Sequence, residues 1–259
     1  MGLFKSLFIY VLFNYISLIL FKKPIMRHLP PIREVKINPI FGFSILGILL
    51  IFLSYFELHA QHTKKLLSKN YIFFRLVNKG EVLITFDDGP SPYTKQILDT
   101  LDKYNVKAIF FLLGKNIEKY PNAVKEIYKR GHIIGNHSYS HSVLLIFKDY
   151  KTIKKEIDST NKLIENITGF KPYLFRPPYG RYSPVMDSVI RELNMKVILW
   201  NDDSEDWKLK NQDEIYFHVI KDLRGGSIIL FHERKNTLKV LGKIIREIDK
   251  RGLKFALIF

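Results

Sequence analysis

From residue 81 onward, short apolar runs alternate with longer stretches in which apolar residues recur every three or four positions. A short apolar run between polar residues is typical of a buried strand, and the longer period is typical of a helix that packs on one face. Strands that alternate with helices form βαβ units, which assemble into a parallel sheet. This alternation therefore predicts an α/β domain over residues 81–259.

The alternation predicts seven strands and six helices. Strands are expected at residues 82–86, 108–113, 132–135, 173–175, 196–200, 227–231 and 254–259, and helices at 94–104, 121–130, 149–168, 184–193, 212–222 and 236–250. The helix at 149–168 ends at Gly169, and one stripe along it carries Ile153, Ile157, Ile164 and Ile167. Seven strands suit either an open sheet or an irregular barrel.

Polar residues follow five of the predicted strands at their carboxyl ends. In both candidate architectures the active site forms at this edge. The residues concerned are Asp87 and Asp88, His137, Arg176, residues 202–207, and His232. Five segments that are far apart in the sequence are thus expected to bring carboxylates, imidazoles and one guanidinium to one face.

Two of these clusters indicate metal chemistry. His137 and His141 are spaced i, i+4 and would share a face on a helical turn. Neutral imidazole is the commonest protein metal ligand, and two imidazoles with one carboxylate leave coordination positions for water and substrate. The adjacent Asp87 and Asp88 can divide labour between a metal and a proton. Taken alone, the Asp-Asp-Gly-Pro sequence also fits a simple turn, and the histidines fit a polar surface loop.

Two further residues, Arg176 and His132, have expected roles. Arg176 precedes Pro177 and Pro178, whose rings restrict the backbone, so its guanidinium can be held against a carboxylate. A plain surface turn is the alternative. His132 is expected to be a packed structural residue rather than a ligand.

Together these segments resemble the polysaccharide deacetylases of the NodB homology type, carbohydrate esterase family 4. The resemblance covers residues 81–259 and is carried, in order, by residues 85–90 (TFDDGP), 137–141 (HSYSH), 176–180 (RPPYG), 206–207 (DW) and 230–232 (LFH). It implies a distorted (β/α) barrel and a metal-dependent hydrolase that removes acetyl groups from N-acetylated or O-acetylated sugars of an envelope or extracellular polysaccharide.

The resemblance also implies roles for single residues. Asp88, His137 and His141 would hold one divalent metal ion, zinc before cobalt, nickel or manganese. Asp87 would be the general base, oriented by Arg176, and His232 would be the general acid, oriented by Asp206. The backbone N–H of Tyr179 would help to hold the oxyanion, and Trp207 and Leu230 would wall the acetyl pocket. Peptidoglycan, chitin oligomers, poly-N-acetylglucosamine and acetylxylan are all open as substrates.

Three features depart from the family pattern. Glu233 stands where the family usually has Asp, and little effect is expected from it. Residues 143–145 (VLL) are more apolar than the usual continuation, so the rim of the cleft is expected to differ. Asp202 and Asp203 are competing partners for His232 or Arg176, which leaves the role of Asp206 more open than the metal set.

The N-terminal region predicts a membrane anchor over residues 1–56. Residues 39–56 are 18 consecutive residues without a charge, which as a helix would span roughly 27 Å, close to the hydrocarbon thickness of a bilayer. Residues 6–21 are a possible second span, and 57–80 are expected to be a juxtamembrane linker. The basic connector 22–38 is expected to be cytoplasmic by the positive-inside rule, which places the catalytic domain on the extracytoplasmic side.

The charge distribution agrees with this division. Of the formal net charge of +16, +9 lies in residues 1–80, where it can meet anionic lipid, and +7 lies in residues 81–259. No nucleic-acid-binding module is recognisable, so nucleic acid is not an expected partner. With no Cys in the chain, any metal must be held by nitrogen and oxygen ligands. The oligomeric state is not predicted.

Two other functions remain open. A catalytically inactive glycan-binding or scaffold protein would keep the fold without needing all six of Asp87, Asp88, His137, His141, Arg176 and His232. A metal phosphoesterase would need more carboxylate ligands for a second metal, and none is placed for this.

Overall fold

A computed structural model describes residues 72–73 and 78–256 of the chain. The predicted spans at 39–56 and 6–21, and most of the linker at 57–80, lie outside these residues. Within the described part, no helix is both long enough and apolar enough to cross a membrane.

The described part is built on a parallel sheet. Its strand order is β1-β6-β5-β4-β3-β2-β8-β7, and β9 pairs with β2. The strands are β1 Ile72–Phe73, β2 Glu81–Gly89, β3 Ile109–Leu112, β4 Ile133–Asn136, β5 Leu174–Phe175, β6 Lys196–Ile198, β7 Asp202–Asp203, β8 Ile228–His232 and β9 Lys254–Phe255. Every strand pair is parallel, as the alternation of strands and helices predicts.

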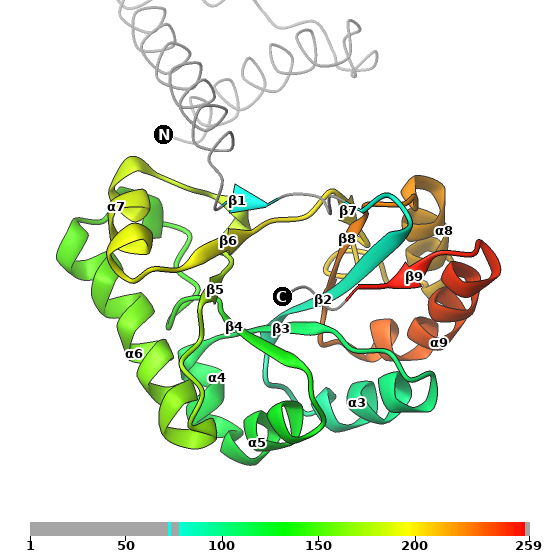
Figure 1. The fold of residues 1–259 in the computed structure, drawn as a ribbon, viewed down its shortest axis with the longest axis horizontal. Coiled ribbons are helices and arrows are strands. Elements are labelled where there is room, and N and C mark those ends of the chain that lie inside the picture. The colour runs from blue at the N-terminus through cyan, green and yellow to red at the C-terminus, as the bar shows by residue number, and fades with distance from the viewer. Residues whose placement is uncertain (1–71, 74–77, 257–259) are drawn as a thin grey trace, which may run out of the picture. The chain divides into compact units, whose positions relative to one another are not determined.

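Helices cover the outer side of the curled sheet (Figure 1). They are α3 Thr94–Lys103, α4 Gly114–Lys119, α5 Pro121–Lys129, α6 Tyr150–Thr168, α7 Pro184–Glu192, α8 Gln212–Asp222 and α9 Lys235–Lys250, with short 3₁₀ turns η1 Leu145–Phe147 and η2 Pro178–Gly180. The result is a half-barrel of parallel strands with helices outside, which is consistent with the predicted distorted (β/α) barrel.

All seven predicted strands are present, and the differences concern elements with little sequence signal. β1 and β7 were not predicted because each has two residues, and β7 consists of two aspartates. β1 lies inside the segment predicted as linker 57–80 and pairs with β6, so the sheet starts earlier in the chain than residue 81. α4 was also missed, because it has six residues and starts at Gly114.

Local sequence sets the limits of α6. The Asp149 carboxylate accepts a hydrogen bond from the Thr152 N–H at 2.7 Å and caps the first turn. Gly169 ends the helix with a φ of 72°, a left-handed conformation that glycine adopts without a Cβ penalty. Between them, Ile153, Ile157 and Ile164 are fully buried, which confirms most of the predicted stripe.

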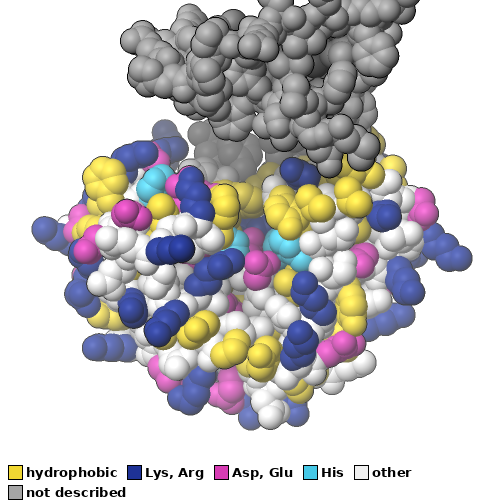
Figure 2. Space-filling model, turned by 180° about the vertical axis from the view of Figure 1, so that it is seen from behind, with side chains coloured by type: hydrophobic (Ala, Val, Ile, Leu, Met, Phe, Trp, Pro, Cys, Tyr) yellow, Lys and Arg dark blue, Asp and Glu magenta, His cyan; other side chains and the backbone are white. Residues whose placement is uncertain are grey.

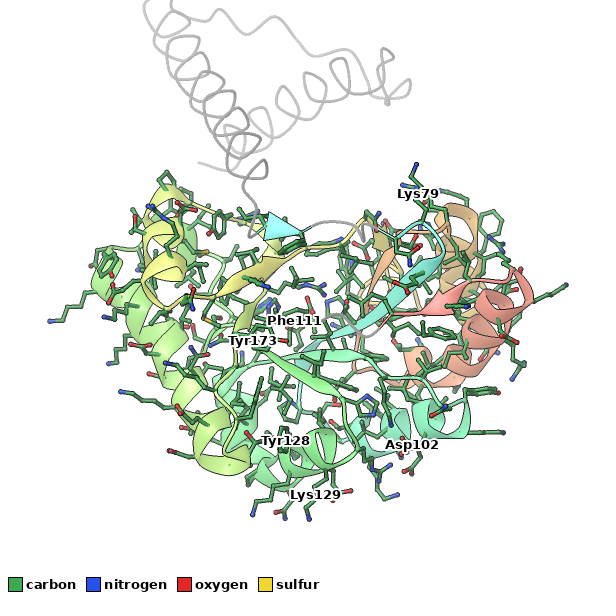
Figure 3. All side chains as sticks on the ribbon, in the orientation of Figure 1. Lys79, Asp102, Phe111, Tyr128, Lys129 and Tyr173 are labelled. Atoms are coloured by element: carbon green, nitrogen blue, oxygen red, sulfur yellow. The ribbon has the colours of Figure 1, made fainter. Side chains whose placement is uncertain are left out.

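Side chains of neighbouring residues on a strand point to opposite faces, so β2 contributes to two different apolar clusters. Ile84 and Phe86 of β2 pack under the helices, together with Phe110 and Phe231. Leu83, next to Ile84, belongs instead to an inner cluster with Ile109, Phe111, Leu174, Ile198 and Ile228. Phe111 of this inner cluster is labelled in Figure 3.

His132 is a structural residue, as predicted. Its side chain is 4% exposed, its Nδ1 accepts a hydrogen bond from the Ala108 N–H at 3.2 Å, and its ring packs edge-on to Phe110. Burial lowers the pKa of His132 to about 4, so the imidazole is neutral at physiological pH.

The outer core depends on an aromatic stack. Phe86 is fully buried, with ring centroids 5.0 Å from Phe110 and 5.8 Å from Phe231. We expect Phe86→Ala to lower the free energy of unfolding by about 3–5 kcal/mol, through lost apolar burial and the cavity left behind. Urea unfolding measures this loss. Phe217→Ala, at a side chain that is 65% exposed, is the control and should change stability by about 0.5 kcal/mol or less. Equal effects at both positions would contradict the assigned core.

Candidate functional site

The carboxyl ends of four strands deliver the predicted residues to one place. In the parallel register, Asp87 of β2 lies beside His232 of β8. Asn136 at the end of β4 pairs with Phe175 of β5, so His137 and Arg176 follow adjacent strands. Histidine and acidic side chains gather on one face of the domain (Figure 2). The predicted convergence at this edge of the sheet is therefore present.

Three of these residues form a candidate metal centre. One ligand atom each from Asp88, His137 and His141 lies within 4.8 Å of the others. The Asp88 Oδ1 atom is 3.3 Å from His141 Nε2 and 3.7 Å from His137 Nε2. Among the described residues this is the one group of three or more His, Cys, Asp or Glu side chains with metal-binding geometry.

The donor atoms fit a cation. Asp88 Oδ1 is buried and has no hydrogen-bond partner among the described residues. His137 Nδ1 lies 2.6 Å from the carbonyl oxygen of Arg176, so this nitrogen carries the proton and donates it. The Nε2 lone pair of His137 therefore faces the carboxylate oxygens, an arrangement that a cation between them would stabilise. Burial lowers the pKa of His137 to about 3 and also lowers the pKa of His141, so both rings are neutral and able to bind metal.

Asp87 is held by Arg176 rather than by this cluster. The Arg176 side chain is completely buried, and its Nη1 donates to Asp87 Oδ1 at 2.8 Å and to Thr85 Oγ1 at 2.7 Å. Its Nε and Nη2 donate to the carbonyl oxygens of Ile198 and Leu199. Burial raises the pKa of Asp87, while the nearby Arg176 opposes the rise. The carboxylate is thus fixed in place with one oxygen, Oδ2, turned towards His137 at 3.6 Å.

His232 and Asp206 form a second pair across the site. His232 Nδ1 donates to Asp206 Oδ1 at 2.6 Å, and the backbone N–H of His232 donates to Asp206 Oδ2 at 2.8 Å. Burial alone would lower the pKa of His232, but Asp206 and the carboxylates of the site outweigh it and the pKa is raised. Asp206, and neither Asp202 nor Asp203, is therefore the partner of His232.

The 137–141 segment is a loop and not a helical turn, so that part of the prediction was wrong. Ser138 and His141 have φ values of 69° and 58°, which break helical geometry. Side chains hold the loop: Asn136 Oδ1 accepts from the Ser138 N–H at 2.7 Å, and Glu156 Oε2 accepts from the N–H groups of residues 139 and 140. Asn136 and Glu156 were missed, although Asn136 stands directly before the first histidine.

The three predicted substrate residues lie in different surroundings. Tyr179 has a φ of 59°, and its ring centroid is 4.6 Å from that of His141. Trp207 is 53% exposed, next to Asp206. Leu230 is buried on β8, two residues before His232. Trp200 was missed by the sequence reasoning; the Arg176 guanidinium lies 5.5 Å from its ring centroid.

Glu233 has a larger structural role than its sequence position suggests. Its side chain is buried, and Oε2 accepts hydrogen bonds from the hydroxyls of Ser91 and Thr94 in the segment after β2. Oε1 has no partner and occupies the space beside Gly89, where a Cβ would lie 2.0 Å from it. Glu in place of the family's Asp was expected to have little effect, but this packing gives Glu233 a structural role. Its carboxyl group connects the end of β8, through hydrogen bonds, to the segment that follows Asp87 and Asp88.

Comparison with known proteins identifies the family. Residues 75–198 match the family model described as Polysaccharide deacetylase. A curated relative, the peptidoglycan-N-acetylglucosamine deacetylase of Bacillus cereus, is 39% identical over 191 residues, which are 71% of this chain and 69% of the relative. The chain belongs to the polysaccharide deacetylase family. The predicted family and enzyme class are thus confirmed.

Two solved structures extend the comparison. A peptidoglycan N-acetylglucosamine deacetylase in complex with a hydroxamate-type benzamide matches with a TM-score of 0.68 and 38% identity, over 72% of this chain and 89% of that chain. A pseudoenzyme of carbohydrate esterase family 4 from Bacillus anthracis matches with a TM-score of 0.69 and 28% identity, over 72% of this chain and 67% of that chain. The same fold therefore occurs in a named deacetylase and in a named pseudoenzyme. Whether a member of the family is catalytic depends on its site residues rather than on its fold.

The buried Glu233 carboxyl should make stability depend on pH. Burial raises its pKa from 4.5 to about 7, so its contribution to stability is complete below about pH 4.5 and is lost as the pH rises through about 7. The difference in Tm between the wild type and Glu233→Gln should therefore decrease as the pH rises from about 4.5 to about 7, and it should stay constant at higher pH. Thermal scans across this range measure the difference. The exposed Glu165→Gln is the control, and a Glu233 difference as flat as the Glu165 difference would contradict the assignment.

Proposed function

We propose that this protein is a metal-dependent hydrolase that removes acetyl groups from the N-acetylglucosamine residues of peptidoglycan. One observation carries the proposal: the strand ends bring together the candidate metal ligands Asp88, His137 and His141, a carboxylate held by Arg176 and an imidazole held by Asp206. Amide hydrolysis needs an activated water, a polarised carbonyl and an acid for the leaving amine, and these groups suit those tasks.

A divalent ion would be held by Asp88, His137 and His141. Bound there, it would act as a Lewis acid on the acetyl carbonyl and lower the pKa of water. Zinc suits two imidazoles and one carboxylate, and cobalt, nickel or manganese are the alternatives. Side chains of the protein itself carry out the proton transfers.

Asp87 is the proposed general base. Its Oδ1 is committed to Arg176, which leaves Oδ2 to accept the proton of the attacking water. Burial of this carboxyl raises its pKa, which strengthens it as a base, while Arg176 opposes the rise. Arg176 is thus a positioning residue that also sets the charge of Asp87.

His232 is the proposed general acid. Its Nδ1–H is bound to Asp206, so Nε2 carries the proton that passes to the leaving amine. The raised pKa of His232 favours the protonated ring that this step requires. The backbone N–H of Tyr179 would donate to the developing oxyanion, and Trp207 and Leu230 would bound the pocket for the acetyl methyl group.

The proposed substrate class follows from the relatives, whose names specify peptidoglycan. Relatives from Bacillus cereus are named for N-acetylglucosamine, which we propose here, and two relatives from Bacillus subtilis are named for N-acetylmuramic acid, which is the alternative residue. The alternative function is that of a catalytically inactive glycan-binding or scaffold protein, as the pseudoenzyme relative illustrates. The intact base, acid and metal-ligand set favours catalysis. Removal of O-linked acetyl groups would use the same residues and is a second outcome of the substrate test.

We further propose a membrane-anchored protein whose catalytic domain is extracytoplasmic. The uncharged stretch 39–56 and the basic connector 22–38 support this placement. Membrane lipid around the N-terminal region would then be a partner, with acetylated peptidoglycan as the substrate.

Acetate release from peptidoglycan tests the proposed function. We expect the full chain to release acetate, to lose at least about tenfold in rate on chelation, and to recover when zinc is added back. Asp87→Asn should lower kcat by about 10²–10⁴-fold, because amide oxygen is a poor base. Asp203→Asn, at a nearby carboxylate without a proposed role, is the control. Activity that survives chelation, or an Asp87→Asn variant as active as the control, would contradict the mechanism.

The pH profile of kcat tests the His232–Asp206 pair. The acid must be protonated, so activity should fall as the pH rises through the pKa of His232. Asp206→Asn removes the interaction that raises this pKa, so the basic limb of the profile should move to lower pH and kcat should fall about tenfold or more. An unmoved basic limb would show that another group is the acid.

A further inference from the structure

The rim of the active site carries an apolar and basic surface that the proposed chemistry does not use. This surface, residues 143–151, is called here the rim segment. Four of its side chains are exposed, namely Val143 at 45%, Leu144 at 53%, Phe147 at 59% and Tyr150 at 38%. Soluble proteins seldom expose aliphatic and aromatic side chains in so short a stretch without a partner.

The rim segment is anchored to the domain on its inner side only. Leu145 is 2% exposed and packs in one core cluster with Ile72, Ile153 and Tyr182. Because buried Leu145 fixes the segment, the exposure of its neighbours Val143, Leu144 and Phe147 is a property of the folded state. The segment begins two residues after His141, so it borders the candidate metal centre.

Charge distinguishes the possible partners. Lys148 and Lys151 are exposed and have no ion pair among the described residues, and Lys155 lies one helical turn further along α6. The single acid of the segment, Asp149, is engaged as the helix cap. The aliphatic Val143 and Leu144 offer sugars neither a stacking face nor hydrogen bonds, whereas the rings of Phe147 and Tyr150 suit either a sugar or a bilayer. Exposed apolar residues ringed by lysines are instead typical of a surface that lies on anionic lipid.

The chain path points to the same partner. Ile72, the first described residue, belongs to the core cluster that holds Leu145, so the chain enters the domain at the base of the rim segment. Between the predicted span, which ends at residue 56, and Ile72 lie residues 57–71, which can reach at most about 50 Å. Such a tether would hold the domain near the bilayer and strengthen a weak surface contact through a high effective concentration.

We propose that the rim segment contacts an anionic lipid bilayer through Val143, Leu144 and Phe147, with Lys148 and Lys151 at the headgroups. If the proposed function holds, this contact places the cleft at the membrane surface, where it reaches glycan strands close to the bilayer. The contact itself requires no catalysis, so it can be tested separately.

Tryptophan substitution with brominated lipids provides the test. The full chain is reconstituted in vesicles of phosphatidylcholine and phosphatidylglycerol in a three-to-one ratio, with Phe147→Trp as the probe and the wild type as background. Phe217→Trp is the matched control, because Phe217 is equally apolar and 65% exposed but lies on α8, on the other side of the domain (Figure 1). Both variants replace exposed side chains and should keep activity on soluble glycan oligomers.

The expected result is quenching at least about twofold stronger for Phe147→Trp than for Phe217→Trp, with a blue shift that weakens in vesicles of phosphatidylcholine alone. Lys148→Gln with Lys151→Gln should reduce the quenching as well. Equal quenching at positions 147 and 217 would overturn the proposal. So would an emission shift of Phe147→Trp that appears with soluble glycan oligomers and not with vesicles, because that would assign the rim segment to substrate.

Discussion

The buried guanidinium of Arg176 is the interaction on which the rest of the site depends. A fully buried charge is tolerated only where its donors are paired, and Arg176 pairs with Asp87, Thr85 and two carbonyl oxygens of the 198–199 backbone. Its own carbonyl oxygen accepts the Nδ1 proton of His137. One residue thus fixes the orientation of the base and the tautomer of a metal ligand. Replacing the Arg176 side chain would therefore disturb the proton acceptor, while the backbone carbonyl that orients His137 would be retained.

The two proton-transfer groups are held by different means, and the difference suits their tasks. Asp87 is fixed by a cation, which stabilises its anionic form against burial. His232 is fixed by an anion, which stabilises its cationic form against burial. Asp87 lies beside His232 in the parallel register of β2 and β8, so two neighbouring strands bring base and acid to the same edge of the sheet without long loops. The sheet register is therefore part of the catalytic geometry.

The sequence predicted the sheet and the site residues because both leave local signals. Apolar runs mark β2, β3 and β8, and polar residues at their ends mark the site. What escaped prediction depends on contacts between distant segments. The loop form of residues 137–141 is imposed by Asn136 and Glu156, and a spacing of four residues alone cannot distinguish it from a helical turn. In the sequence, Glu233 looks like a conservative replacement of the family's Asp. Its structural role comes from hydrogen bonds with Ser91 and Thr94, which are distant in the sequence. The two-residue strands β1 and β7 are defined only by their partners.

The central claim is that Asp88, His137 and His141 hold one divalent ion while Asp87 remains bound to Arg176. Anomalous X-ray diffraction at the zinc edge, from crystals of active enzyme, tests it most directly. The predicted result is one peak about 2.0–2.2 Å from an Asp88 oxygen and from the Nε2 atoms of His137 and His141, with the Asp87–Arg176 ion pair intact. A peak coordinated by Asp87, or an active enzyme with no peak between the three ligands, would contradict it.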